Sequence, residues 1–352
     1  MKRNIIMSEL IQSEIETNRR SVAFDSYDIT VKQLYDMILE NIIDIAPEYQ
    51  RHFNWDSKRQ SQLIESLLLG IPVPSLYMAT NKDASWEVVD GVQRLTTIIN
   101  FLHEKTTLTN TKFTKLRLDG LEKLSSINGL TFEELPRSVQ LIFQTRPVRV
   151  TVLNDRSDFA VRYDLFERLN TGGVTLHPQE IRNCVFLGEF NDFLKECANN
   201  VNFRSVVKMT SNAERSGSYE ELVLRFFAYY EDQNEFVHGV TDFLNKYMQR
   251  KTKVFTNKKE LNSIFSKTFL TLKENLPNGI VRLPRKNLTP VILYEAIATG
   301  VARNIKKNKT IIGSKLKNLL NDNQLKDYTT GATNTKSILD KRISYVSEYI
   351  SK

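Results

Sequence analysis

Apolar residues in the first 200 residues recur at helical spacing in some segments and at strand spacing in others. "SKRQSQLIESLLLG" (57–70) predicts an amphipathic helix, with Asp56 or Ser57 as its N-cap and Gly70 as its stop. "TVKQLYDMILE" (30–40) has the same periodicity. We therefore expect two helices early in the chain. The apolar face of the 57–70 helix consists of Leu63, Ile64, Leu67 and Leu68.

Short apolar runs predict strands between and after these helices. "IPVPSLYMA" (71–79) predicts a proline-stiffened turn that enters a strand, and "WEVVD" (86–90) predicts a second strand. A helix is expected from about Gly91, because apolar residues recur at helical spacing after it. "VRVTVLN" (148–154) alternates at period two, as a strand does, whereas residues 105–135 are rich in turn residues.

Helical patterns dominate the later part of the chain. "DFAVRYDLFERLN" and "HPQEIRNCVFL" predict two helices separated by a Thr-Gly-Gly break, and Pro178 suits a first helical turn. Beyond about residue 200 the pattern is almost entirely helical. We therefore predict an α/β domain over residues 1–200, followed by a helical domain over 201–352. The clearest helical segments of the second half are 219–230, 239–250, 259–276 and 289–305.

Composition narrows the class of protein. The chain has 352 residues, of which 41% are apolar, and this is enough for two packed domains. Two cysteines in so long a chain favour a reducing compartment, and the N-terminus has no apolar signal region. The longest uncharged stretch, Ser66 to Asn81, contains two prolines and is too short to span a bilayer. We expect a cytoplasmic protein with no membrane partner.

Charge is distributed unevenly along the chain. Residues 1–250 carry 29 Lys and Arg against 34 Asp and Glu, whereas residues 251–352 carry 20 against 7. The net charge is therefore −5 for residues 1–250 and +13 for residues 251–352. A basic segment of this kind favours double-stranded DNA, because binding releases counterions from the phosphates. A solvated lysine-rich surface, or one that meets an acidic protein partner, fits the same pattern. The candidate DNA contacts are Lys251, Lys253, Lys258, Lys259, Arg303, Lys306, Lys307 and Lys309.

The joint "VVDGVQR" (88–94) admits two interpretations. Asp90 and Gln93 have the spacing of a capping box, which needs no ligand. That interpretation does not account for Gly91, which weakens a first turn, or for Arg94, a cation at the positive end of a helix dipole. Both residues suit a phosphate bound at the helix N-terminus, where free amides point at the anion and Arg94 binds it bidentately.

Two other segments add candidate residues. "YQRHFNW" repeats the Gln-Arg pair at Gln50 and Arg51, so two arginines could converge on one anion; ordinary surface ion pairs are the alternative. Asn170 ends a predicted helix before Gly172 and Gly173, which suit either a phosphate-binding nest or a simple helix stop. The four histidines are scattered and form no zinc-binding pair: His52, His103, His177 and His238.

Taken together, these motifs resemble one family. "YQRHFNWDSKRQSQLIESLLLGIPVPSLYM", "EVVDGVQRLTTIINF", "FERLNTGGVTLHPQEIRN" and "YEELVLRFFAYY" are similar to the N-terminal domain of GmrSD-type modification-dependent restriction endonucleases, and "TTGATNTKSILDKRISYV" is similar to the end of stand-alone members. The resemblance covers the chain from about residue 25. It implies an α+β protein, in which a ParB/sulfiredoxin-like domain with a small mixed sheet and helices precedes a helical domain. It also implies nucleoside triphosphate hydrolysis in bacterial or phage DNA defence.

Two departures from the family bear on activity. The family motif reads Asp-Gly-Gln-Gln-Arg, whereas Val92 stands here in place of the first glutamine, so hydrolysis could be slow or lost while binding survives. Members that cut DNA carry a C-terminal His-Asn-His nuclease domain, and no histidine follows His238. Cutting would then need a separate nuclease or modification-system subunit, or the α/β half itself.

The leading hypothesis is a triphosphate-binding and hydrolysing protein that senses DNA or regulates a restriction system. Its expected cofactor is Mg²⁺ at Asp90, because that carboxylate and a polyphosphate otherwise repel each other. The alternatives are a ParB-like nickase or nuclease, and a non-catalytic DNA- or protein-binding module with a degenerate pocket. The expected roles are phosphate binding by Gly91, Arg94 and Arg51, orientation of phosphate or water by Gln93 and Gln50, and a pocket lining by Asn170.

Overall fold

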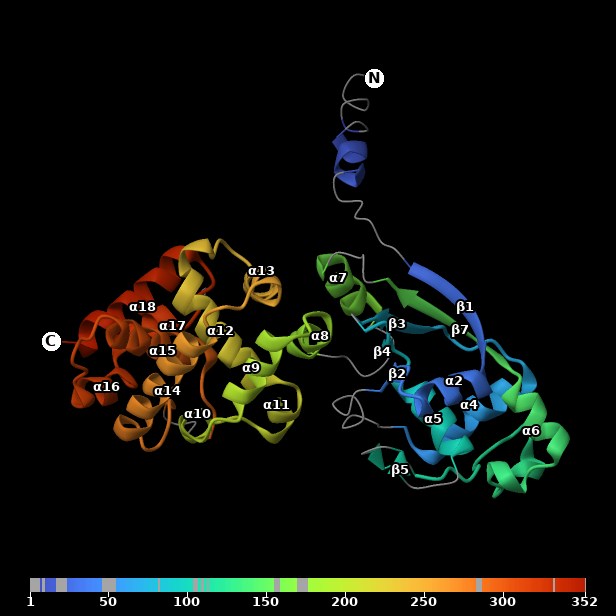
Figure 1. Cartoon of the computed structure of the whole chain (residues 1–352). Helices are drawn as coiled ribbons and strands as arrows, with labels where there is room; N and C mark the ends of the chain where they lie inside the picture. Colours follow the sequence, from blue (N-terminus) through green and yellow to red (C-terminus); the bar gives the residue numbers. More distant parts are fainter. Residues whose placement is uncertain are drawn as a thin grey trace. The chain divides into compact units, whose positions relative to one another are not determined.

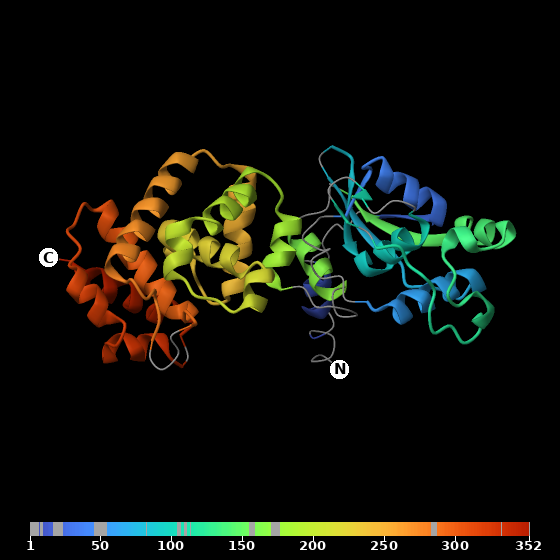
Figure 2. The same ribbon diagram turned by 90° about the horizontal axis from the view of Figure 1, so that it is seen from below.

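The computed structural model divides into two compact units, Met1–Thr175 and Leu176–Lys352. Each unit has its own set of elements (Figures 1 and 2). No helix among the described residues is both long and apolar enough to cross a membrane. The structure describes residues 7, 10–16, 24–45, 55–81, 83–103, 107–108, 111–112, 114–154, 159–169, 177–282, 287–331 and 333–351.

The first unit is built on a mixed five-stranded sheet with the order β1-β7-β3-β4-β2. Its central strands β7 and β3 run parallel, whereas β1 pairs antiparallel with β7 and β3 pairs antiparallel with β4. The short β2 closes the far edge, parallel to β4. The strands span Phe24–Thr30 (β1), Ile43–Asp44 (β2), Leu76–Thr80 (β3), Trp86–Asp90 (β4) and Pro147–Leu153 (β7).

Helices α2, α4 and α5 group together beside this sheet (Figure 1) and share one hydrophobic core with it. Local sequence sets the limits of α4: the Asp56 carboxylate accepts a hydrogen bond from the Arg59 amide at 2.7 Å, and Gly70 ends the helix with a φ of 74°. The helices of the unit are α2 (Val31–Leu39), α4 (Ser57–Leu69), α5 (Val92–Leu102), α6 (Arg137–Gln144) and α7 (Phe159–Leu169).

The turn-rich region between α5 and α6 contains only short elements in its described part. These are β5 (Thr107–Leu108), β6 (Thr111–Lys112) and the 3-10 turns η1 (Ser125–Ile127) and η2 (Phe132–Glu134). Phe132 of η2 packs edge-on against Phe101 of α5, and Phe143 of α6 completes an aromatic cluster at the base of the region. This cluster fixes α6 against the end of α5.

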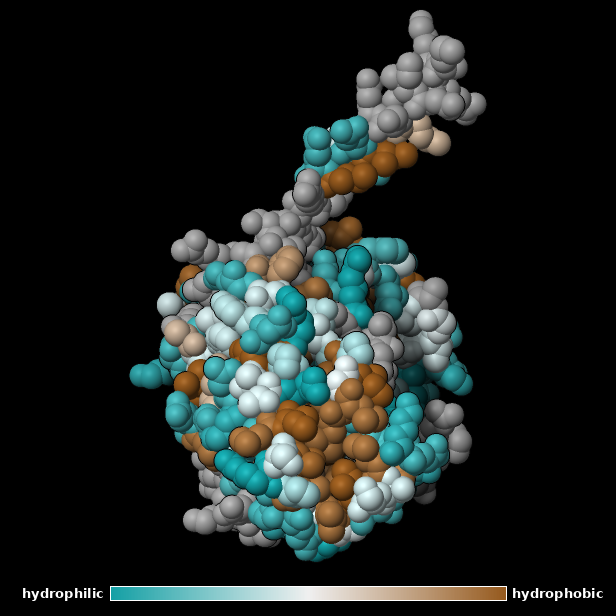
Figure 3. All heavy atoms as spheres, turned by 90° about the vertical axis from the view of Figure 1, so that its right-hand side faces the viewer, coloured by the Kyte–Doolittle hydropathy of each residue, from teal (hydrophilic) through white to brown (hydrophobic). Residues whose placement is uncertain are grey.

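Apolar side chains also gather on the outer surface of the first unit. Figure 3 faces the side on which α6 lies and shows a hydrophobic area there. Leu141 and Ile142 of α6 are exposed, as are Leu69 and Ile71 at the end of α4, and α4 and α6 contact each other.

Helices form the regular structure of the second unit in its described residues, and short bridge contacts occur as well, such as that between Ile311 and Ser351. Its core is rich in aromatic rings, for example Phe265 and Phe269, whose centroids lie 4.4 Å apart. The helices are α8 (Pro178–Val185), α9 (Glu189–Ala198), α10 (Val201–Val206), α11 (Ser211–Arg215), α12 (Ser218–Asp232), α13 (Val240–Lys253), α14 (Lys258–Asn275), α15 (Val291–Lys306), α16 (Gly313–Leu319), α17 (Asn323–Thr329) and α18 (Lys336–Ile350), with η4 (Gln233–Glu235) after α12.

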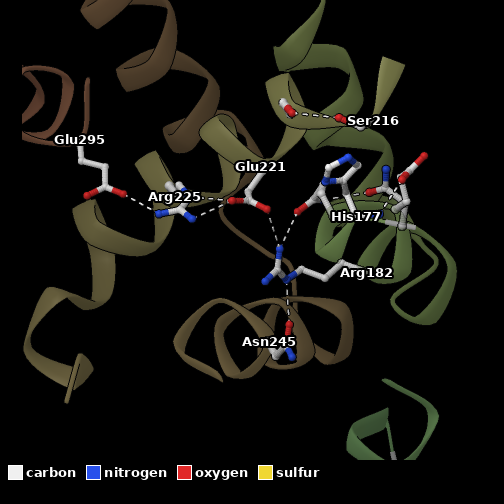
Figure 4. A network of polar contacts seen from close by, with 11 residues as sticks. His177, Arg182, Ser216, Glu221, Arg225, Asn245 and Glu295 are labelled. Atoms are coloured by element: carbon white, nitrogen blue, oxygen red, sulfur yellow. Dashed lines mark hydrogen bonds and ion pairs between the residues drawn. The ribbon is translucent and has the colours of Figure 1, made fainter. Parts of the chain in front are cut away.

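A largely buried chain of ion pairs links five residues of this helical unit, and Figure 4 shows its part from Arg182 to Glu295. Arg182 of α8 pairs with Glu221 of α12, which also binds Arg225 at 2.7 Å. Arg225 reaches Glu295 of α15 at 2.7 Å, and Glu295 pairs in turn with Arg342 of α18. Glu295 is fully buried. Because each carboxylate lies between two guanidinium groups, the network compensates the cost of burying charge.

The α+β class is confirmed, and the strands predicted within 71–79, at 86–90 and at 148–154 correspond to β3, β4 and β7. The structure differs from expectation in two respects. The division between units lies at Thr175, not at residue 200, because α8 and α9 pack against α12 of the helical unit. Strand β1 has no counterpart among the predicted elements; its residues are largely exposed, so no clear alternation marks it.

Candidate nucleotide site at the joint between β4 and α5

Gly91 forms the joint between β4 and α5 in a left-handed conformation with a φ of 102°. A Cβ atom at this position would lie 2.3 Å from Cδ2 of Leu76 on the neighbouring strand β3. Both facts favour glycine, because other residues rarely adopt this φ and a Cβ atom would force the buried side chain of Leu76 to move. The packing of the fold thus accounts for Gly91 without a ligand.

Arg94 is held by backbone and side-chain acceptors. One of its guanidinium nitrogens donates to the carbonyl of Ser75 at 3.0 Å and to that of Pro74, while the other lies 2.6 Å from an oxygen of Asp90. Its side chain is only 13% exposed. Arg94 therefore ties the turn before β3 to the end of β4. No local pattern indicates this structural use, since Pro74 and Ser75 are about 20 residues away.

The expected capping box between Asp90 and Gln93 is absent. Gly91 is the N-cap of α5, so Asp90 lies one residue too early and is the last residue of β4. Because glycine has no side chain, the first turn of α5 has no side-chain cap. The positive end of this helix dipole faces the joint, and an anion there would be favoured. Gln93 lies half-buried on the same first turn.

Val92 occupies the first helical position and packs partly buried against the core of the first unit. Val92, which stands where the resemblance implies a glutamine, thus has a packing role of its own. The other candidates for this site, Gln50, Arg51 and Asn170, lie outside the described residues. Whether they converge on the joint stays a prediction.

The chemistry of the joint suits a metal bound to a ligand better than a metal bound by protein alone. Asp90 is 37% exposed and its carboxylate already pairs with Arg94. Within the described ranges, no group of three or more His, Cys, Asp or Glu side chains could hold a metal ion. One carboxylate fits Mg²⁺ that is carried mainly by phosphate oxygens. The described residues therefore offer no metal cluster that would support the nuclease alternative.

The basic residues predicted to contact DNA differ in exposure. Lys251 is buried, and its ammonium lies 2.7 Å from Glu231 and 3.1 Å from Asn257. Arg303 is half-buried and donates to Gln233; burial lowers its pKa. Lys258 lies 3.7 Å from Glu196. These three have polar partners within the protein. The remaining members of the set are exposed, although Lys306 also lies 5.2 Å from the ring centroid of Tyr230. These exposed members are Lys253, Lys259, Lys306, Lys307 and Lys309.

The buried network of the helical unit is not among the sites predicted from the sequence. Glu221 and Arg225 are four residues apart on one helix, a spacing that signals an ion pair, but Glu295 and Arg342 come from distant segments. His177 is the N-cap of α8, and its amide donates to the Glu180 carboxylate at 2.7 Å. This histidine therefore has a structural role at the start of a helix.

Comparison with known proteins gives one family. Residues 31–187 match the family described as the GmrSD restriction endonuclease N-terminal domain. No curated protein matches the sequence. A solved structure of a Pnob8-like ParB-N domain matches at 13% identity over 94% of this chain and 99% of that chain, with a TM-score of 0.24, which is too low to establish a shared fold. The family match begins at the start of α2, ends just after α8 and contains the β4–α5 joint. Residues 31–187, which make up slightly less than half of the chain, are therefore similar to the GmrSD restriction endonuclease N-terminal domain.

Proposed function

We propose that the protein binds a nucleoside triphosphate at the β4–α5 joint and uses its hydrolysis to sense DNA or to regulate a restriction-type defence system. The family that residues 31–187 resemble carries this proposal, since its named member is a restriction endonuclease, and such enzymes act on DNA. The joint lies inside that segment. A DNA-defence role is thus the function that family and chemistry support together.

The local chemistry of α5 supports a phosphate ligand. The first turn of the helix has no side-chain cap, and its dipole favours an anion at this end. Arg94 lies beside it, and an incoming phosphate would compete with Asp90 for the guanidinium. Gln93 would orient phosphate or the attacking water, with Gln50, Arg51 and Asn170 as further proposed ligands. Mg²⁺ bound to the phosphates would offset the charge of Asp90.

A turnover assay on the full chain tests this proposal. Phosphate release from ATP and GTP is measured with and without Mg²⁺ and duplex DNA, for the natural protein and for Gln93→Ala. We choose Gln93 because it is half-buried at the joint. It does not take part in the hydrogen bonds that Arg94 donates to the carbonyls of Pro74 and Ser75. Hydrolysis that needs Mg²⁺ and falls in the variant supports the proposal. Absence of both binding and turnover would refute it.

The second candidate is a non-catalytic module that binds DNA or a protein partner. Two observations favour it: Arg94 already has three acceptors within the protein, and Val92 packs on the core where the resemblance implies a glutamine. Nucleotide binding without turnover, with or without DNA, distinguishes this candidate from the first.

A further inference from the structure

A cavity of about 550 Å³ lies at the opposite end of α5 from the joint. It is formed between α2, the end of α5, η2 and α6, all within the first unit. Helix α5 has 11 residues and is therefore about 16 Å long, which separates the cavity from the nucleotide site. The volume is in the range of small-molecule sites.

The walls of the cavity combine an apolar surface with one hydrogen-bonded polar pair. Leu39, Leu102 and Phe132 supply apolar surface. The hydroxyl of Tyr35 on α2 lies 2.6 Å from Nδ1 of His103, and the histidine side chain is 8% exposed. This pair joins α2 to the end of α5. A ligand with an apolar body would fit between these walls and meet polar atoms at their base.

The charges around the cavity leave one cation in excess. Lys32 pairs with Asp36 on its own helix, and Glu133 pairs with Lys115 at 2.8 Å. Arg137 donates to Gln140 Oε1 at 3.3 Å, and no carboxylate in the described part of the chain lies within ion-pair distance of it. A planar guanidinium binds carboxylate and phosphate oxygens in a bidentate manner.

The position of Arg137 in its helix supports the same conclusion. It is the first residue of α6, where the helix dipole is positive and a cation is unfavourable. Its N-cap, Pro136, makes no side-chain cap hydrogen bond. An anion bound by Arg137 would offset the unfavourable position of the cation and would also lie at the uncapped N-terminus of α6. The side chain is exposed at the rim, so packing does not explain its presence there.

From these observations we infer that the cavity is a second binding site, which takes a small organic anion: a carboxylate or phosphate monoester with a compact apolar body. Arg137 binds the oxyanion, and Leu39, Leu102 and Phe132 contact the apolar body. This inference does not depend on nucleotide binding at the other end of α5.

Calorimetric titration of the full chain with three probes tests the site. Benzoate and phenyl phosphate offer the same ring with different oxyanions, and benzamide offers the ring without charge. We expect at least one anion to bind, and the tighter of the two identifies the class of ligand. Benzamide is expected to bind about tenfold more weakly or not at all, since it cannot form a charge-assisted hydrogen bond with the guanidinium.

Three variants locate the binding. Arg137→Gln is expected to weaken the anion about tenfold, because the guanidinium is removed from an exposed position that needs no repacking. Leu39→Trp, which fills the cavity from an exposed helix end, should abolish binding. Arg59→Gln, at an exposed arginine of α4 outside the cavity, is the charge-matched control and should change nothing.

Several outcomes would overturn the inference. They are equal affinity for benzamide, an affinity that Arg137→Gln leaves unchanged, and no binding of either anion. Phenyl phosphate could also bind at the β4–α5 joint, so Gln93→Ala is titrated as well. If that variant, and not Arg137→Gln, fails to bind phenyl phosphate, the ligand occupies the joint and the cavity site is refuted.

Discussion

The guanidinium of Arg94 lies 2.6 Å from the carboxylate of Asp90, so the two charged residues at the head of α5 neutralise each other. This pair lies at the joint between β4 and α5, and the same guanidinium holds the carbonyls of Pro74 and Ser75. Any phosphate that enters the joint must share Arg94 with these groups. Arg94 therefore both holds the turn before β3 in place and is the proposed phosphate ligand.

Replacement of Arg94 separates these two roles. Arg94→Ala should abolish the stabilisation that a nucleoside triphosphate gives. It should also lower the free energy of unfolding by about 1–3 kcal/mol, because the carbonyls of Pro74 and Ser75 and the carboxylate of Asp90 lose their charged donor. Urea denaturation with and without Mg²⁺-nucleotide measures both effects. A variant that is still stabilised by nucleotide as much as the natural protein would contradict the phosphate role.

A variant at Val92 tests whether valine, in place of the glutamine that the resemblance implies, weakens catalysis. Val92→Gln should raise the turnover rate with little change in affinity, since the restored amide would act mainly in the transition state. Because valine packs partly buried on the core, the variant should be slightly less stable, and rates are compared at a temperature where both proteins are folded. A lower Kd without a faster rate would show that the position only tunes binding.

The exposed lysines at the end of α15 and just after it test the DNA proposal. Reversal of Lys306, Lys307 and Lys309 to glutamate should weaken binding to all duplex sequences alike and reduce the salt dependence. The expected reduction is about 0.9 in log K per log salt for each phosphate that the variant no longer neutralises. Binding is measured by fluorescence anisotropy over a range of salt concentrations, and nucleotide binding should be unchanged.

Lys317 and Lys341 are exposed lysines of the same unit, and their reversal provides the control for general charge. If the control weakens DNA binding as much as the test variant, the 306–309 cluster is no specific DNA-binding surface. If the natural protein has no affinity for DNA at low salt, the alternative in which these lysines meet an acidic protein partner is favoured.

Glu295 anchors the ion network between α12, α15 and α18. Glu295→Gln should destabilise the second unit by about 3–5 kcal/mol, because the buried Arg342 and the half-buried Arg225 then lose their shared carboxylate. Glu348→Gln removes an exposed carboxylate from α18 and should have almost no effect. Thermal and urea unfolding measure the difference, and equal stability of the two variants would contradict the structural role.

The same network predicts a loss of stability in acid. Burial raises the pKa of Glu221, but Arg225 and Arg182 outweigh this effect and hold the pKa of the carboxyl below its usual range. A carboxylate with a depressed folded-state pKa stabilises the protein fully above its unfolded pKa of about 4.3. That contribution is lost as pH falls further, through the folded pKa. Glu221→Gln should show a flatter decline in unfolding free energy over this range.

Local sequence was sufficient to predict most elements of the first unit. Asp56 and Gly70 specify the ends of α4, and alternation of apolar residues specifies β7, because caps and periodicity act within a few residues. Strand β1 is different. Its exposed residues become a strand only by pairing with β7, which lies more than 100 residues later in the chain.

The sequence by itself determined where the candidate joint lies, since a strand pattern, a glycine and a helix pattern meet at Gly91. Only the tertiary structure decided why those residues are needed. A Cβ atom at Gly91 would force Leu76 to move, and the carbonyls of Pro74 and Ser75 engage Arg94. Likewise, the cavity beside Arg137 and the pairing of Glu295 with Arg342 bring together residues from separate segments. Such arrangements depend on chain packing, and no local pattern encodes the distance between side chains that are far apart in sequence.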